Sequence, residues 1–302
     1  MSTSKSNTLK FIFLFLILTF SFSSVFYYLM IQGHNFRGPA GLYAMGLQWS
    51  PAIAAYLVYR YSKRNIRIMA WNWGLFRFRL WAYLLPLFYA TVCYVIIWLT
   101  GLGHFYSKRF VSETMASFGF TGLSDGLVIV SSFILFAIYM LPVRMAHALG
   151  EEIGWRGFLV PELMKITSYT QTSLISGMIW AVWHFPILIL SDYNNGTPAW
   201  YGLTCFTVLV MSNSFVITWL RLRSDSIWPA VLLHASHNLF IQSFFTPITQ
   251  DTGNTRYFVD EFGAFLALAN LLLAYYFWTR RHELKKDVSP ASTGESPVIA
   301  SG

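Results

Sequence analysis

Ionisable and amide side chains gather in three short motifs in the second half of this 302-residue chain. The motifs contain, in chain order, Glu151, Glu152 and Arg156, then His184, then His234 and Asn238. A carboxylate that is free of other partners can act as a base. Imidazole and amide groups can donate hydrogen bonds to the oxyanion that forms when water attacks a carbonyl carbon. The motifs therefore contain the groups that a water-activating hydrolase needs.

The first motif holds two consecutive acids that a helix would separate. If residues 151–165 are helical, Glu152 and Arg156 are i,i+4 neighbours in the order that favours an ion pair. Glu151 is then rotated by about 100° from Glu152 and does not face the arginine. This predicts a structural carboxylate, Glu152, and a second carboxylate, Glu151, that is free to act as a base. The alternative is that both acids cap the N-terminus of a helix, where negative charge is favoured.

The other two motifs supply polar groups on helix faces. His234 and Asn238 are also i,i+4, so one face presents an imidazole and an amide together. His237 lies about 60° from His234 on the helical wheel, and it either shares that face or bonds to a neighbouring helix. Trp180 precedes His184 by one turn, where it either shields the histidine from lipid or serves as ordinary packing.

The elements that must position these motifs are membrane-spanning helices. Only 11% of the residues are charged and 55% are hydrophobic, whereas a soluble domain carries about 25% charged residues. Apolar runs cover residues 10–31, 39–59, 80–102, 126–148, 167–191, 200–220, 226–248 and 261–279. Runs of this length can cross ~30 Å of hydrocarbon, which argues against a soluble protein with a large apolar core. We predict an all-α, polytopic membrane protein with about eight transmembrane helices.

The first run is expected to be a retained helix. It is longer than the apolar core of about 7–15 residues in a cleavable signal sequence, and residues 21–24 offer no small-x-small cleavage site.

The basic residues predict the orientation. When the connections between runs are assigned alternately to the two sides, 17 of the 21 Lys and Arg residues fall on the side of the N-terminus. Cytoplasmic loops carry this excess, so both termini are predicted to be cytoplasmic in a multi-pass protein of the cell membrane. Residues 60–79 alternate arginines with apolar residues, as does an amphipathic segment in the headgroup layer. The basic residues form no patch interleaved with stacking aromatics, which argues against a nucleic-acid partner.

Four regions follow from these patterns. Residues 1–124 hold the first transmembrane helices and the amphipathic segment, 125–248 the core with the three motifs, 249–281 the last transmembrane helix and 282–302 a cytoplasmic tail. The tail is predicted to be disordered because it contains few apolar residues. Cys93 and Cys205 stand singly in different runs, so no disulfide framework or zinc ribbon is expected.

The three motifs, in this order, resemble those of the CPBP family, which includes the Ras-converting CAAX endopeptidases and bacteriocin-processing or self-immunity membrane proteins. The family patterns are EExxxR, FxxxH and HxxxN, and they match Glu151 to Arg156, His184, and His234 with Asn238. Trp180 stands where the second motif commonly has Phe, which keeps an aromatic side chain but changes the shape of the pocket. The resemblance covers roughly residues 125–245.

The resemblance implies a mostly helical, glutamate-dependent intramembrane endopeptidase. Glu151 would be the general base that activates water, with His184 holding or deprotonating that water. His234 and Asn238 would stabilise the oxyanion, and Glu152 with Arg156 would fix the geometry. The expected partners are membrane lipids and a peptide or protein substrate that carries a lipid if the CAAX-type resemblance extends so far. No cofactor is required.

Three alternatives remain open. Glu151, His184 and His234 could instead ligate a catalytic zinc ion with an open position for water, although the chain lacks the HExxH motif that other membrane metalloproteases carry. A non-catalytic immunity or scaffold protein could bind a partner through the same cavity. A proton-coupled transporter could also use buried Glu and His, but no internal repeat supports one.

The predicted boundaries leave one conflict of depth. Glu151 would follow the run 126–148 near the inner membrane surface, whereas His184 would lie ~25 Å along a helix that starts at residue 167. The two side chains meet only if the later helix starts further on and tilts, or if Glu151 is buried more deeply than hydropathy indicates.

Overall fold

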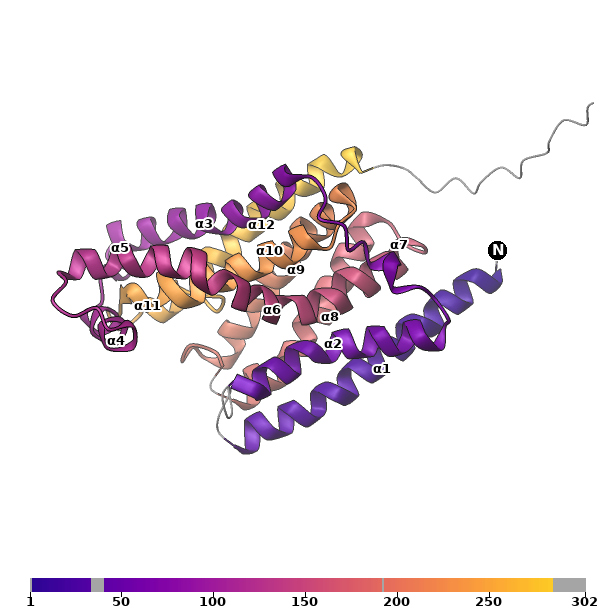
Figure 1. The fold of residues 1–302 in the computed structure, drawn as a ribbon, viewed down its shortest axis with the longest axis horizontal. Coiled ribbons are helices and arrows are strands. Elements are labelled where there is room, and N and C mark those ends of the chain that lie inside the picture. The colour runs from indigo at the N-terminus through magenta and orange to yellow at the C-terminus, as the bar shows by residue number, and fades with distance from the viewer. Residues whose placement is uncertain (1, 34–40, 192, 285–302) are drawn as a thin grey trace, which may run out of the picture.

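The computed structural model describes residues 2–33, 41–191 and 193–284, and this part of the chain is a bundle of long helices (Figure 1). In chain order the α-helices are α1 (Ser2–Gln32), α2 (Leu42–Tyr61), α3 (Phe76–Leu99), α4 (Lys108–Phe118), α5 (Asp125–Leu135), α6 (Leu141–Glu152), α7 (Val160–Met164), α8 (Tyr169–Leu190), α9 (Ala199–Ser224), α10 (Trp228–His237), α11 (Thr246–Ile248) and α12 (Ala264–Thr279). Short 3-10 or π-helical stretches are η2 (Ile66–Met69), η3 (Phe136–Met140), η4 (Ile153–Leu159), η5 (Asn238–Phe245), η6 (Thr255–Tyr257) and η7 (Arg280–Glu283). Two short strands, β1 (His104–Phe105) and β2 (Thr249–Gln250), pair antiparallel.

The all-α, polytopic fold is confirmed. Five helical segments are long and apolar enough to cross a membrane, namely Lys5–Gln32, Phe76–Leu99, Asp125–Met164, Tyr169–Leu190 and Ala199–Ser224. The other three predicted runs correspond to α2, to the stretch from α10 to α11, and to α12. These are less apolar or shorter: polar side chains such as Gln48 and His234 interrupt the first two, and α12 has only 16 residues.

The end of the chain departs slightly from the predicted boundaries. The last helix begins at Ala264 rather than at residue 261, so Glu261 lies in the connection that precedes it. His282 and Glu283 close the 3-10 turn η7 after α12. The remainder of the predicted tail, from residue 285, lies outside the described residues.

The helix that carries the first motif is longer than the apolar run predicted. Elements α5, η3, α6, η4 and α7 form one helical segment of 40 residues, Asp125–Met164. Residues 150–156 lie inside this segment, and Glu151 is only 2% exposed. Helix α8 also begins later than expected, at Tyr169. The conflict of depth is therefore removed mainly because the first motif is buried within a helix that continues past it.

Two glycines bring α2 close to the first motif. A Cβ atom at Gly150 would lie 2.7 Å from the carbonyl oxygen of Gln48, and one at Gly154 would overlap Pro51. Small residues four apart allow membrane helices to approach in this way. Since Glu151 and Glu152 lie between the two glycines, this contact fixes their position.

Aromatic side chains hold α8 against η4 and α1. The rings of Trp155 and Trp183 contact edge to face with centroids 5.8 Å apart, and Phe15 contacts Trp155 at the same centroid distance. The Trp183 indole also donates a hydrogen bond to Ser23 Oγ at 2.7 Å. His184 follows Trp183 directly, so this core sets the position of the second motif.

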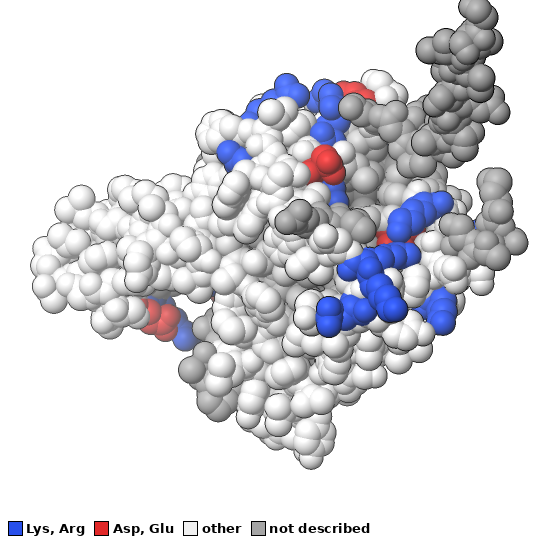
Figure 2. Space-filling model, turned by 45° about the vertical axis from the view of Figure 1, so that its right-hand side comes forward, with Lys and Arg blue, Asp and Glu red and all other residues white. Residues whose placement is uncertain are grey.

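Charged side chains are unevenly distributed over the surface. Figure 2 shows Lys and Arg gathered toward one end of the molecule, whereas the part that protrudes at the left is almost uncharged on this face. A separation of basic residues of this kind is what the predicted orientation requires. The cytoplasmic location of both termini stays a prediction.

Candidate active site

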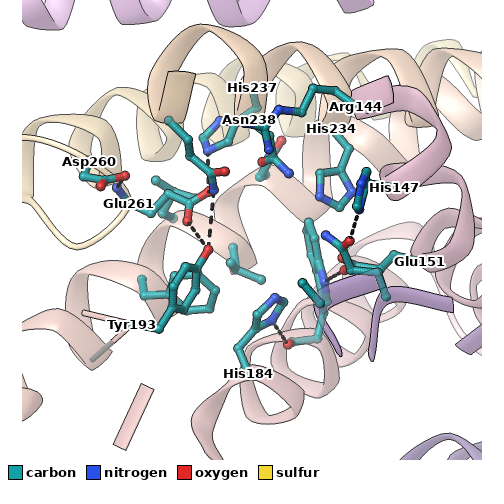
Figure 3. A pocket seen from close by; sticks show the side chains of 18 of the residues that line it. Arg144, His147, Glu151, His184, Tyr193, His234, His237, Asn238, Asp260 and Glu261 are labelled. Atoms are coloured by element: carbon teal, nitrogen blue, oxygen red, sulfur yellow. Dashed lines mark hydrogen bonds and ion pairs between the residues drawn. The ribbon is translucent and has the colours of Figure 1, made fainter. Parts of the chain in front are cut away.

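One cavity of about 470 Å³ brings together the four residues that the sequence singled out for chemistry (Figure 3). Glu151 reaches it from α6, His184 from α8, His234 from α10 and Asn238 from the first residue of η5. Helices α8 and α9 pack side by side, and α10 packs against α6 and α9. Residues separated by 87 positions in the sequence therefore face a common space.

Glu152 and Arg156 lie behind the cavity and do not line it. Arg156 Nη1 is 3.1 Å from Glu152 Oε1, and both side chains are completely buried. This is the i,i+4 ion pair that the spacing predicted. Arg156 also donates to Ser214 Oγ of α9 at 3.2 Å, so the pair ties α6 and η4 to α9.

Glu152 also holds His234, a contact that no spacing in the sequence indicated. The Nδ1 atom of His234 is 2.9 Å from Glu152 Oε1. A carboxylate can only accept, so Nδ1 carries the proton and the ring presents Nε2 on its other side. Nε2 donates a hydrogen bond only when the ring is protonated on both nitrogens. Glu152 therefore sets both the orientation and the proton distribution of His234.

Trp180 is a hydrogen-bonding partner rather than a simple wall. Its indole nitrogen donates to Glu151 Oε2 at 2.8 Å. The guanidinium carbon of Arg156 lies 4.4 Å from the centroid of the Trp180 ring. The rings of Trp180 and His234 pack edge to face, with centroids 5.3 Å apart. One side chain thus positions Glu151 and separates it from the Glu152–Arg156 pair.

His184 is oriented by the backbone of its own helix. Its Nδ1 atom is 2.9 Å from the carbonyl oxygen of Trp180. Because a carbonyl accepts, Nδ1 carries the proton and Nε2 of the neutral ring is an acceptor. The ring also packs edge to face on Trp183 and Phe206. His184 is thus suited to accept a hydrogen bond from a water molecule in the cavity.

A second pair of acids, Asp260 and Glu261, lines the same cavity and was missed from the sequence. His237 Nε2 is 3.1 Å from Glu261 Oε1, and Gln242 donates to the same oxygen at 3.2 Å. The Tyr193 hydroxyl donates to the other oxygen, Oε2, at 3.3 Å. Asp260 and Glu261 lie in the connection before α12 and belong to no motif, so only their acidic character in an apolar chain was available as a signal.

His237 both shares the cavity face of His234 and bonds to a neighbouring helix, the two alternatives that the sequence left open. The ring lines the cavity that His234 lines, and its Nδ1 atom bonds to the hydroxyl of Tyr89 on α3. His237 therefore bridges α3 and Glu261.

The two carboxyls of the second pair differ in proton affinity. Burial, with the adjacent charge of Glu261, raises the pKa of Asp260 to about 7. Burial also opposes ionisation of Glu261, but the hydrogen bond and charge of His237 outweigh it and hold the pKa of Glu261 below its usual range. Below about pH 7 Glu261 is the charged member of the pair.

Two further polar residues lie on the cavity side of α6. His147 precedes Glu151 by one turn, and its Nδ1 atom is 2.6 Å from Gln48 Oε1 of α2. Arg144 donates to Ser243 Oγ of η5 at 2.6 Å. Over the described ranges, His, Cys, Asp and Glu side chains form no group of three or more that could hold a metal ion.

The comparisons with known proteins fall on the region that carries the three motifs. Residues 132–240 match the family model of type II CAAX prenyl endopeptidases, described as Rce1-like. A CAAX prenyl protease 2 from Methanococcus maripaludis is 27% identical over 172 residues, which are 55% of this chain and 56% of the relative. The chain therefore matches little more than half of that relative's length. The resemblance indicated by the motifs is confirmed for this region, and Asp260 and Glu261 lie beyond the family match.

Proposed function

Because the region that holds the three motifs is similar to the type II CAAX prenyl endopeptidases, we propose that this chain is a membrane-embedded endopeptidase. The observation that carries the proposal is the convergence of Glu151, His184, His234 and Asn238 on one buried cavity. A binding site for a protein partner would not need a base, a water-holding histidine and oxyanion donors in one place.

In the proposed reaction, water is held between the Glu151 carboxylate and Nε2 of His184. Glu151 takes one proton as the water oxygen attacks the carbonyl carbon of the scissile peptide bond. His234 and Asn238 donate hydrogen bonds to the oxyanion of the tetrahedral intermediate. The carbon–nitrogen bond then breaks, and the proton held by Glu151 passes to the leaving amine.

Glu152, Arg156 and Trp180 act as positioning residues in this scheme. Glu152 keeps His234 turned toward the cavity, and Arg156 holds Glu152 in place through their ion pair. Trp180 holds one oxygen of Glu151, which leaves the other oxygen for the water. The scheme uses the side chains of this chain alone, and we propose that no resident metal ion takes part.

The proposed substrate is a protein with an apolar or lipidated segment near the cleaved bond. The cavity has apolar linings from two sides: Phe206, Leu209 and Val210 on α9, and Met140 and Val143 in η3 and α6. Such surfaces accept aliphatic side chains or a lipid, whereas the polar groups contact the peptide bond.

The test is cleavage of a library of lipidated and leader peptides by the full chain in lipid nanodiscs. Wild type is compared with Glu151→Gln and with Glu113→Gln, which removes an exposed carboxylate in α4. Cleavage that is lost in Glu151→Gln, retained in Glu113→Gln and resistant to a zinc chelator supports the proposal. Chelator-sensitive cleavage would replace it by a metal mechanism, and absence of any Glu151-dependent cleavage would favour a binding protein.

A further inference from the structure

A second cavity, of about 430 Å³, lies where the first turns of α3 meet the last turns of α9 and α12. Its lining residues are Arg77, Phe78, Trp81, Leu85, Trp219, Leu220, Arg223, Leu273, Tyr276, Phe277, Arg280 and Glu283. Among the described residues, none lines both this groove and the active-site cavity. We refer to it as the arginine groove.

One part of the arginine groove is strongly basic. Arg77, Arg223 and Arg280 come from three different helix ends, and Glu283 is the acid among the lining residues, so the lining has a net charge of +2. Arg280 is held in place: it bonds to Glu283 and donates to the Tyr276 hydroxyl at 2.7 Å. Glu283 neutralises part of this charge through its bond to Arg280, and the positive charge that remains would attract an anion.

The rest of the groove is apolar. Leu85 of α3 and Leu273 and Phe277 of α12 line it, and Trp219 forms its floor by contacting Phe277 at 5.1 Å between ring centroids. Trp81 is 64% exposed beside these residues. Exposed tryptophan and arginine at the ends of apolar helices are typical of the boundary between headgroups and hydrocarbon.

We propose that the arginine groove binds one anionic phospholipid. The phosphate would contact Arg77, Arg223 and Arg280, because guanidinium groups match phosphate oxygens in charge and geometry. One acyl chain would lie along Leu85 and Leu273, toward the middle of the membrane. Basic pockets between transmembrane helices commonly bind such headgroups on the cytoplasmic side, and this end is the one predicted to be cytoplasmic.

The shape and charge of the groove favour this ligand over two others. A soluble phosphate compound would leave the apolar half unused, and a basic peptide would be repelled by the arginines. A bound lipid would also join α3, α9 and α12, and α9 carries Phe206 and Leu209 to the active-site cavity. Lipid binding would therefore stabilise the bundle around the site without taking part in its chemistry.

The test is retention of phosphatidylglycerol by the purified full chain in native mass spectrometry, compared with phosphatidylcholine of the same acyl chains. The double variant Arg77→Gln, Arg223→Gln is expected to retain about tenfold less phosphatidylglycerol, because each arginine near a headgroup contributes measurably to binding. The matched control, Arg60→Gln with Lys63→Gln, removes two exposed charges, one in the last turn of α2 and one just after it, and is expected to behave as wild type.

The test includes a third variant and a competition experiment. Leu273→Gln, which leaves the charges intact, is expected to weaken retention through loss of acyl-chain contacts, and it carries the test if the double variant does not fold. Excess inorganic phosphate is expected to leave the lipid bound. Equal retention of both lipids, equal loss in variant and control, or displacement by inorganic phosphate would overturn the assignment.

Discussion

Two pairs of consecutive acids, Glu151–Glu152 and Asp260–Glu261, contribute to the site from different parts of the chain. In each pair one carboxylate bonds to a histidine of α10: Glu152 to His234 and Glu261 to His237. The surroundings of these two carboxylates differ. A buried guanidinium accompanies Glu152, whereas neutral donors from Tyr193 and Gln242 accompany Glu261.

This difference indicates how the work of the site is divided. The charge of Arg156 compensates that of Glu152, which serves to hold His234 in place. Glu151 is then the member of the first pair that can act as a base. The second pair has no such guanidinium among its described contacts. It carries a single negative charge, on Glu261, because Asp260 stays protonated up to about pH 7. We infer that the first pair carries out the reaction and the second shapes the cavity.

The largest predicted effect comes from breaking the ion pair behind the first pair of acids. Arg156→Met leaves Glu152 buried without its cation, and we expect the free energy of unfolding to fall by about 3–5 kcal/mol. His237→Phe removes one of three donors from the Glu261 carboxylate, which keeps those of Tyr193 and Gln242, and should cost about 1–3 kcal/mol. Chemical unfolding in detergent measures both. Equal losses would mean that the two pairs are held by interactions of similar strength.

Arg109→Met is the control for this comparison. It breaks the exposed Arg109–Glu113 pair of α4, whose side chains are 84% and 62% exposed, and should leave stability almost unchanged.

The next effect concerns the hydrogen bond from Trp180 to Glu151. Trp180→Phe restores the residue that the family motif commonly has but removes the donor from Glu151 Oε2. A hydrogen bond to a charged group is worth about 1.5–3 kcal/mol, so kcat/KM should fall by roughly 10–100-fold. Peptide cleavage in nanodiscs measures it, with Trp200→Phe on the surface as control. An unchanged rate would show that Glu151 does not depend on this donor.

The smallest effect is a dependence of stability on pH that belongs to the second pair. Because its pKa is raised to about 7 in the folded protein, Asp260 keeps a proton that the unfolded chain loses above about pH 4. Stability due to this group is therefore present at low pH and lost as the pH rises to about 7. Glu261, whose pKa is lowered, titrates below this window and does not obscure it.

Asp260→Asn should flatten this pH dependence. We expect the drop in unfolding temperature between pH 5 and pH 8 to shrink by a few degrees, which corresponds to a change of about 1–2 kcal/mol in the free energy of unfolding. Asp125→Asn, at the start of α5, serves as control. An unaltered pH dependence in Asp260→Asn would mean that Asp260 is ionised across this range.

The contrast between the pairs also explains what the sequence could predict. Glu152 with Arg156, and His234 with Asn238, are four residues apart, and helical geometry alone places each couple on one face. The link from His234 to Glu152 crosses between helices and is visible only in the packed bundle. Asp260 and Glu261 lie in a connection, where no periodicity relates them to the motifs. Hydropathy also ended the fourth run too early, because the polar residues 151–156 continue the helix inside the protein rather than at its surface.

The most direct test of the division between the two pairs is to measure kcat/KM for Glu151→Gln and Glu261→Gln side by side on one cleaved peptide. Both substitutions keep the shape of the side chain and remove one buried charge from the same cavity. We predict a loss of about 10²–10⁴-fold for Glu151→Gln, as expected for a general base, and a loss below about tenfold for Glu261→Gln. A larger loss in Glu261→Gln than in Glu151→Gln would contradict this prediction and would move the catalytic base to the second pair.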